Sequence, residues 1–329
     1  MLILLRALAL SAIVMKSSAL PAAKHDSSSR TSSDGCLAAT RVTTIPERPR
    51  QGTLFRVQLV GAVSNARLSG VVAGEPLHFS QDSSGTWTAL APVPIDSVAS
   101  LGVLVRCAIS AAEDSLRIRI PIVAVTYPIE KLRVAPRFGA EPDSALAARL
   151  AREGRRAADV SLLSHDTPRM WTRPFVAPRA SRITSRFGGG REFNGAVTSR
   201  HMGTDFTGVR GAEIRATNRG IVRLVDAFFL GGNVVYIDHG EGLVTAYLHQ
   251  TKQLVSEGDT VERGQVIGRV GSTGRVTGPH LHFIVRYGGI SVDPQAFLSS
   301  FGGRVPATRP PAKGASKRRA KSSAKRLAQ

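Results

Sequence analysis

The sequence predicts a mainly β protein with two folded parts, and three observations support this. Short apolar stretches alternate with turn residues along most of the chain, one segment has a helical pattern, and the C-terminal segment is polar and basic. The predicted order is a β-sandwich domain at 40–127, a connector with one short helix at 128–173, an all-β domain at 174–300 and a disordered basic tail at 301–329. With 329 residues, 42% of them hydrophobic, the chain can bury two cores.

The first domain carries the strand pattern of a β-sandwich. Apolar stretches such as "TLFRVQLVG", "GTWTAL" and "SLRIRIPIVAV" recur with turn residues between them. Many short strands at such spacing are typical of two packed antiparallel sheets.

Residues 143–163, "DSALAARLAREGRRAADVSLL", predict the connecting helix. Asp143 or Ser144 can cap it directly after Pro142, and Gly154 weakens its middle. Its approximate apolar stripe consists of Leu146, Leu150, Ala157 and Val160.

The N-terminus predicts export. Residues 1–23 contain an apolar run followed by small residues, as in a secretory signal peptide, and a Ser-rich leader at 24–39 is expected to be flexible. Because little charge precedes the apolar run, an uncleaved membrane anchor is the alternative. The expected location is the periplasm, the cell envelope or the extracellular space.

Cys36 and Cys107 are the only cysteines. Two cysteines in an exported chain predict one structural disulfide, which would pin the N-terminal segment to the β-sandwich. Both lie in the first half of the chain, away from the histidine-rich motifs.

The net charge of +20 is concentrated in part at the C-terminal end. From Phe301 to Gln329 there are nine Lys or Arg residues and no acid, among Ala, Ser, Pro and Gly. Such a segment buries too little apolar surface to fold. It can bind an anionic polymer or surface, with no specific nucleic acid implied, or it can serve only as a solubilising tail.

The stretch "GPHLHF" at 278–283 places two histidines one strand period apart. If "HLHFIVRY" is a strand, His280 and His282 share one face with Ile284 and Arg286, because side chains alternate. The opposite face is apolar and is expected to pack in a core. Two adjacent imidazoles suit a metal site in which one binds the ion and the other stands beside it.

Two further motifs carry possible metal or acid–base groups. "SRHMGTD" supplies His201 and Asp205, which a straight strand would hold about 13 Å apart, so the backbone has to curl at Gly203. In "TAYLHQ", His249 is expected to share a polar strand face with Thr245 and Tyr247, opposite Val244, Ala246 and Leu248.

Taken in order, these pieces resemble the LytM/lysostaphin-type zinc peptidases. The motifs are His201-x-x-x-Asp205, Tyr247-Leu-His249 and Gly278-Pro-His280-Leu-His282. They are framed by "TSRFG", "IDHGEGLVTAYLH", "EGDTVERGQVIGRVGSTGRVTGPHLHF" and "VDPQAFL". The resemblance covers about 174–300 and leaves the first domain outside.

The resemblance implies a zinc-dependent endopeptidase acting on peptidoglycan, in the stem peptide or cross-bridge. It makes His201, Asp205 and His282 the ligands of one Zn²⁺ and His249 and His280 the non-ligand catalytic pair. Three ligands leave a fourth position for a zinc-activated water. The histidine pair would take its proton or stabilise the developing oxyanion, and the sequence leaves these two roles undivided.

Two other functions remain open. A catalytically silent wall-binding or hydrolase-activating module would share the fold, although all five site positions are intact. A non-haem iron enzyme can also use two histidines and one carboxylate, although the additional histidines and the export signal argue against it.

The other histidines are assigned no catalytic role. We expect His78 to be structural in the sandwich, His239 to lie in the "DHGEG" turn, His165 to belong to the connector and His25 to the leader.

Overall fold

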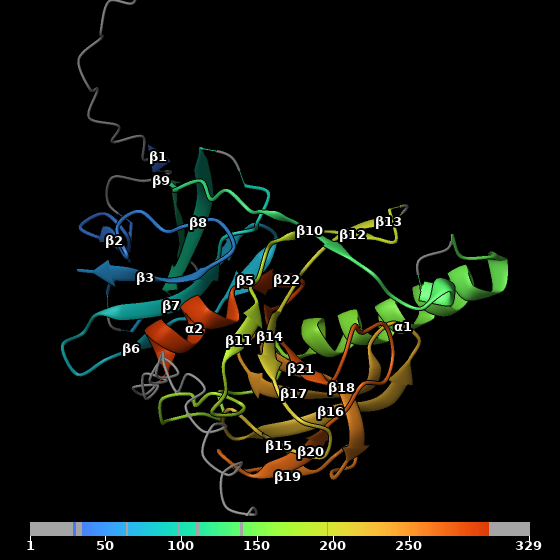
Figure 1. Cartoon of the computed structure of the whole chain (residues 1–329). Helices are drawn as coiled ribbons and strands as arrows, with labels where there is room; N and C mark the ends of the chain where they lie inside the picture. Colours follow the sequence, from blue (N-terminus) through green and yellow to red (C-terminus); the bar gives the residue numbers. More distant parts are fainter. Residues whose placement is uncertain are drawn as a thin grey trace, which may run out of the picture.

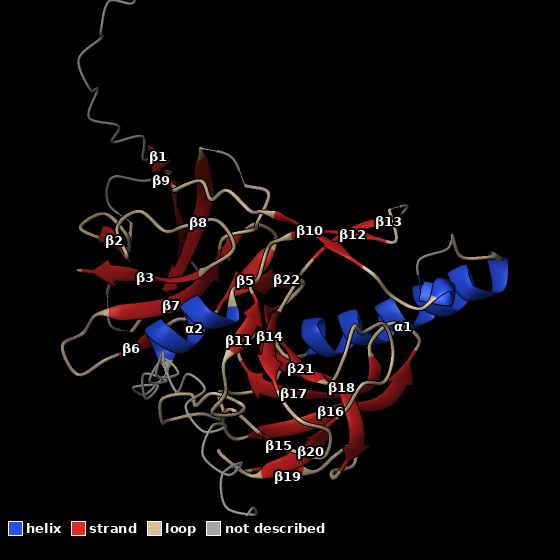
Figure 2. Cartoon of the chain, viewed as in Figure 1, coloured by secondary structure: helices blue, strands red, loops and turns tan. Residues whose placement is uncertain are grey.

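The computed structural model describes residues 29–30, 35–63, 65–97, 99–109, 112–138, 141–195 and 197–302. Strands dominate this part of the chain, which confirms the mainly β prediction (Figure 1, Figure 2). The predicted signal peptide, most of the leader and almost all of the basic tail lie outside the described residues. None of the helices in the described ranges is long and apolar enough to cross a membrane.

The N-terminal β-sandwich consists of two antiparallel sheets. One has the order β1 (Ser29–Arg30), β9 (Ala112–Pro121), β8 (Ser100–Ile109), β4 (Arg67–Val72) and β5 (Glu75–Leu77). The other has the order β2 (Arg41–Ile45), β3 (Leu54–Val60), β7 (Trp87–Pro92) and β6 (Ser80–Gln81). Alternate residues of both sheets, such as Phe55 and Val57 in β3 and Val103 and Val105 in β8, form a shared core.

The predicted disulfide is present. Cys36 and Cys107 are bonded, and the turn around Cys36 packs on the sandwich, where Leu37 is 1% exposed. The main-chain N–H of Leu37 donates to Asp114 Oδ2 at 2.9 Å, so residues 35–39 of the predicted leader are tied to the sandwich.

The C-terminal body is built on a ten-stranded sheet. Its main order is β11 (Ile183–Ser185), β14 (Thr204–Thr207), β21 (His280–Tyr287), β18 (Leu243–Gln253), β17 (Gly232–Gly240), β16 (Gly220–Phe228) and β19 (Thr260–Val261). In addition, β20 (Val266–Val270) pairs with β15 (Glu213–Arg215) and β18, and β22 (Ile290–Val292) pairs with β21.

Both faces of this sheet are buried, and the sequence alternation assigns each residue to its face. In β18, Leu243 and Tyr247 point into the main core, whereas Val244, Ala246 and Leu248 point to the opposite face. In β21, all four residues of the predicted apolar face lie in the main core, namely Leu281, Phe283, Val285 and Tyr287. The predicted two-faced pattern of this strand is therefore confirmed.

Helix α1 (Ser144–Leu163) covers the second face of the sheet (Figure 1). Asp143 caps it by accepting from the main-chain N–H of Leu146 at 2.8 Å. Ala157 and Val160 are buried against β16–β18, so this helix packs on the sheet as well as connecting the two parts of the chain.

Helix α2 (Pro294–Phe301) closes the main core on the other side. Asp293 caps its N-terminus, and Phe297, Leu298 and Phe301 are buried. A single-turn 3₁₀ helix, η1 (Pro136–Phe138), precedes α1.

A small sheet joins the connector to the C-terminal body. Its order is β10 (Ile129–Leu132), β12 (Gly190–Phe193) and β13 (Val197–Arg200), with β10 parallel to β12. The connector therefore contains, besides the predicted helix, a strand that was not predicted, because main-chain groups of 129–132 pair with those of 190–193.

The sandwich packs directly against the C-terminal body. Tyr287 Oη donates to the carbonyl of Pro76 at 2.8 Å, and the main-chain N–H of Gly289 donates to Glu75 Oε1 at 2.9 Å. The other Glu75 oxygen contacts His165 Nε2 at 3.0 Å, and His165 Nδ1 lies 2.8 Å from a ring nitrogen of His78. His78 and His165 thus belong to one interface.

Candidate metal centre and its surroundings

His201 lies in a bend that connects the small sheet to the large one. Strand β13 ends at Arg200, and β14 begins at Thr204. The main-chain N–H of His201 donates to the carbonyl of Gly189, and its carbonyl accepts from the N–H of Gly188, both at 2.7 Å. These two hydrogen bonds fix the position of the main chain from which the His201 side chain extends.

Gly203 lets this bend lie against β21. A Cβ at this position would stand 2.6 Å from the carbonyl oxygen of Phe283 and 2.7 Å from the ring of His282. The glycine is therefore required by close approach of the chain rather than by a left-handed backbone. Asp205 follows in β14, directly opposite His282 in the ladder.

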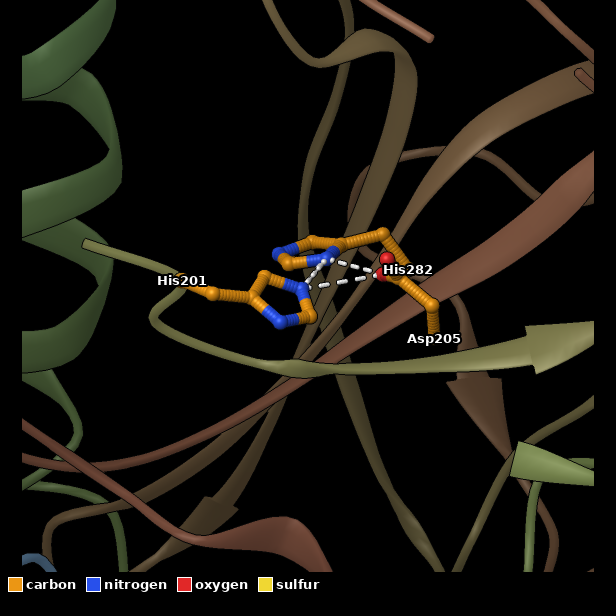
Figure 3. A group of neighbouring side chains, drawn as sticks. All are labelled: His201, Asp205 and His282. Carbon is orange, nitrogen blue, oxygen red and sulfur yellow. Dashed lines mark hydrogen bonds and ion pairs between the residues drawn. The ribbon is translucent and has the colours of Figure 1, made fainter. Parts of the chain in front are cut away.

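Three polar atoms from these elements converge on one point (Figure 3). His201 Nε2 lies 3.0 Å from Asp205 Oδ1 and 2.9 Å from His282 Nδ1, and the last two atoms are 2.7 Å apart. All three residues are less than 9% exposed. One ion at about 2.0–2.2 Å from each atom fits this triangle, since zinc binds imidazole nitrogen and carboxylate oxygen at such distances.

The protonation of the cluster also fits a cation. His201 Nδ1 lies 2.8 Å from the carbonyl of Arg186 and must donate to it, so its Nε2 lone pair points at the Asp205 carboxylate. Burial lowers the pKa of His282 to about 4, so this ring is neutral near pH 7. Burial raises the pKa of the Asp205 carboxyl group, but the polar and charged groups around it lower the pKa by more, so it is ionised. A carboxylate facing neutral imidazole nitrogens is a donor set for a divalent metal.

His249 joins this cluster through an unusual backbone conformation. Its φ of 62° is left-handed, which is rare for a residue other than glycine, and the β18 ladder is irregular just beyond it. The alternation predicted for β18 therefore fails at His249. Tyr247 is fully buried in the main core, whereas His249 faces His280 and His282, with ring centroids at 4.9 and 5.8 Å.

The polar face predicted for β18 is thus wrong. Tyr247 Oη contacts the hydroxyls of Thr217 and Thr245 at 3.0 Å inside the core. The hydroxyl groups of Thr245 and Tyr247 are hydrogen-bonded to each other there. The polar side chains of this strand therefore do not show which of its faces carries the site.

His249 and His280 present the same nitrogen to the cluster. His249 Nδ1 donates to the carbonyl of Thr273 and His280 Nδ1 to that of Gly278, both at 2.8 Å. Each ring therefore has its Nε2 lone pair available, and His280 Nε2 lies 3.7 Å from Asp205 Oδ1. Burial and the neighbouring rings of His282 and His280 lower the pKa of His249 well below its usual value, which keeps it neutral.

Arg191 holds the outer oxygen of the cluster carboxylate and was not identified from sequence. Its guanidinium donates to Asp205 Oδ2 at 2.7 Å and to Ser185 Oγ at 3.0 Å. Glu130 of β10 lies 3.5 Å from the same guanidinium and accepts from Ser185 Oγ. Arginine carries only hydrogen-bond donors and cannot bind a metal, so the metal-ligand pattern of the sequence does not point to Arg191.

Two cavities flank the cluster. One of about 480 Å³ is bounded by β10, Arg191, Asp205, Arg275 and His280. The other, of about 170 Å³, is bounded by Arg191, His201, His249, Arg275 and His282. Open space therefore adjoins the cluster.

His239 was predicted in a turn but is a fully buried residue of β17. Its Nδ1 donates to the carbonyl of Arg219 at 2.7 Å, and its Nε2 accepts from Thr245 Oγ1 at 2.8 Å. Both ring nitrogens are satisfied inside the core, and burial lowers its pKa to about 4. His239 is a structural residue.

Comparisons with known proteins identify similar sequences and a similar fold. The family model described as Peptidase family M23 matches residues 199–294, which include all five residues of the predicted site. Peptidoglycan DD-endopeptidase ShyC of Vibrio cholerae is 43% identical over 95 residues, which are 29% of this chain and 22% of that protein. DD-carboxypeptidase/endopeptidase Mpg of Neisseria meningitidis is 42% identical over 94 residues, with the same two shares.

The matched segments span about a fifth of these curated relatives. A solved structure of an M23 peptidase from Pseudomonas aeruginosa matches the fold more widely, with a TM-score of 0.59 over 77% of this chain and 96% of that one. At 23% sequence identity, this similarity concerns the fold alone. The region of similar fold extends well beyond residues 199–294.

Proposed function

The chain carries a domain of peptidase family M23 at residues 199–294, and from this premise we propose that it is an exported, zinc-dependent endopeptidase acting on peptidoglycan. The bond that it cuts would be a peptide bond of the stem peptide or cross-bridge. The names of the relatives support the substrate, since ShyC is a peptidoglycan DD-endopeptidase and Mpg a DD-carboxypeptidase/endopeptidase.

The observation that carries the proposal is the convergence of His201 Nε2, Asp205 Oδ1 and His282 Nδ1 within 2.7–3.0 Å of one another. We assign these three atoms as the ligands of one Zn²⁺. When bound there, zinc would lower the pKa of a water molecule towards neutrality and polarise the carbonyl of the peptide bond.

His249 and His280 would then handle the proton. Each donates through Nδ1 to a carbonyl, so each can accept a proton at Nε2, next to the ligand cluster. A ring that has taken a proton can donate it to the leaving nitrogen or to the developing oxyanion. Because both rings have the same tautomer, either His249 or His280 can accept the first proton.

Arg191 would act through Asp205. By holding Oδ2, it leaves Oδ1 directed at the two ligand histidines. A carboxylate fixed in this way offers one oxygen to the metal instead of swinging between two arrangements.

Digestion of purified peptidoglycan tests the proposal directly. We expect new amino termini in the stem peptide or cross-bridge, identified by mass spectrometry, which a chelator abolishes and added zinc restores. A protein that holds zinc but releases no peptide would instead be a binding or activating module. Metal analysis after purification without added metal distinguishes zinc from iron.

The two ends of the chain would serve the same function. Export to the periplasm, cell envelope or exterior brings the protein to its polymer. The basic tail beyond Gly302 would bind anionic polymer in a salt-sensitive manner, because salt screens exposed charges strongly.

A further inference from the structure

Arg275 lies in the loop between β20 and β21, beside the candidate metal centre. Its main-chain N–H donates to the carbonyl of Leu230 at 2.9 Å, and its guanidinium lies 3.9 Å from the ring centroid of Phe193. The side chain is half-buried. It bounds both cavities that flank the cluster, as does Arg191.

Arg275 has no acidic partner within ion-pair distance among the residues that the structure describes. The neighbouring Arg191 differs, because Asp205 and Glu130 both lie against its guanidinium. Desolvation lowers the pKa of Arg275, and the positive charge of Arg191 lowers it further. A partly buried cation beside another cation is unfavourable until an anion pairs with it.

We propose that Arg275 binds a free carboxylate of the substrate, on the residue that supplies the leaving nitrogen. The proposal rests on the proposed peptidase function. Only the residue that supplies the leaving nitrogen can carry a free α-carboxylate next to the cut bond. On the acyl side, the α-carbonyl is itself part of that bond. The preferred substrates are therefore peptides whose leaving residue has an unblocked α-carboxylate.

The side chain is suited to this role. A guanidinium binds a carboxylate through two parallel hydrogen bonds, which fix orientation as well as charge. Stacking on Phe193 leaves the edge of the guanidinium for such bonds and limits its motion. A bound carboxylate would thus orient the adjacent peptide bond across the cluster.

A matched substrate pair tests the proposal. The pair is N-acyl-D-alanyl-D-alanine with a free terminal carboxylate and the same peptide with a terminal amide. We expect the wild-type protein to favour the free acid in kcat/KM by about 10–100-fold, the size of a charge-assisted hydrogen bond. Arg275→Gln should bring this ratio close to 1, and Arg275→Lys, which keeps only a point charge, should give an intermediate ratio.

Arg210→Gln is the control, because it removes the same charge from an exposed residue outside both cavities. Its acid-to-amide ratio should match the wild type. A wild-type protein that does not distinguish the two peptides would overturn the proposal. So would an Arg275→Gln variant that loses both activities equally, since this indicates a purely structural stacking role.

A binding measurement separates this inference from the peptidase function. In zinc-free, ¹⁵N-labelled protein, the Nε–H signal of Arg275 is assigned by its loss in Arg275→Gln. N-acetyl-D-alanine should shift this signal and N-acetyl-D-alaninamide should not. A shift without any hydrolysis by the zinc-loaded protein would contradict the proposed peptidase function but support carboxylate binding by Arg275. No shift with the carboxylate would overturn the anion site, whether or not peptidoglycan is digested.

Discussion

His249 and His282 lie on one side of the sheet with their ring centroids 5.8 Å apart, although the strand alternation would place them on opposite sides. In the ladder, Leu248 is opposite His282 and Tyr247 is opposite Phe283. A regular strand would therefore send His249 into the core with Tyr247. The left-handed φ of 62° at His249 turns its ring to the site instead.

This backbone conformation predicts an inverted order of stability for two substitutions. At most strand positions glycine is less stable than alanine, but a positive φ costs an L-residue about 1–2 kcal/mol. His249→Gly should therefore have a free energy of unfolding about 1 kcal/mol higher than His249→Ala, as measured by urea denaturation. The same pair at Lys252, an exposed residue of this strand with no positive φ, should show the usual order. A less stable glycine variant at 249 would contradict this account of the backbone.

Close approach of the chain at Gly203 predicts a penalty for a single methyl group. Gly203→Ala should lower the free energy of unfolding by about 1–3 kcal/mol and weaken zinc binding, because its Cβ would meet the Phe283 carbonyl and the His282 ring. Gly154→Ala is the matched control, since a Cβ there meets nothing within 4 Å and the residue lies within α1. That variant should gain about 0.5–1 kcal/mol. Equal effects of the two would refute the packing argument.

The sequence was sufficient for the features that follow from local alternation. The two faces of β21 were predicted because Leu281, Phe283 and their partners alternate without interruption, and Asp143 is the N-cap out of the two candidates, Asp143 and Ser144, that precede the helix pattern. The five candidate site residues were identified because their spacing resembles a family pattern, and the fold brings them together.

What could not be predicted depends on chain segments that are distant in sequence. Gly203 was assigned to a curl, but the reason for a glycine is the carbonyl of Phe283 on another strand. Arg191 meets Asp205 through a second, smaller sheet whose edge strand comes from the connector. His239 looked like a turn residue because "DHGEG" ends with turn-forming residues, yet its partners Arg219 and Thr245 bury it.

Burial of His239 predicts that stability falls in acid. Its pKa is about 4 when folded, against 6.5 as the ordinary value, so between these pH values the unfolded chain binds a proton that the folded protein excludes. The free energy of unfolding should therefore fall as the pH drops from about 6.5 to 4, by up to roughly 3 kcal/mol from this residue. Urea denaturation of the zinc-free protein at several pH values measures it.

His239→Gln should show a smaller loss over this range, because glutamine does not titrate. Thr245→Val is the control, since it removes the hydrogen bond to His239 Nε2 but keeps the imidazole. That variant should be less stable at every pH and keep the acid-dependent loss. The same pH dependence in the wild type and in His239→Gln would show that His239 is not its source.

Zinc content measured beside turnover, for single alanine variants at each of the five site residues, tests the central claim most directly. The wild-type protein, His249→Ala and His280→Ala should each hold one zinc, and the last two should lose turnover by about 10²–10⁴-fold. Asp205→Ala, His201→Ala and His282→Ala should lose both the metal and the activity, because two ligands remain at a site that needs three. If Asp205→Ala keeps its full zinc, or if His280→Ala loses zinc while His282→Ala keeps it, the assignment of ligands and acid–base residues is contradicted.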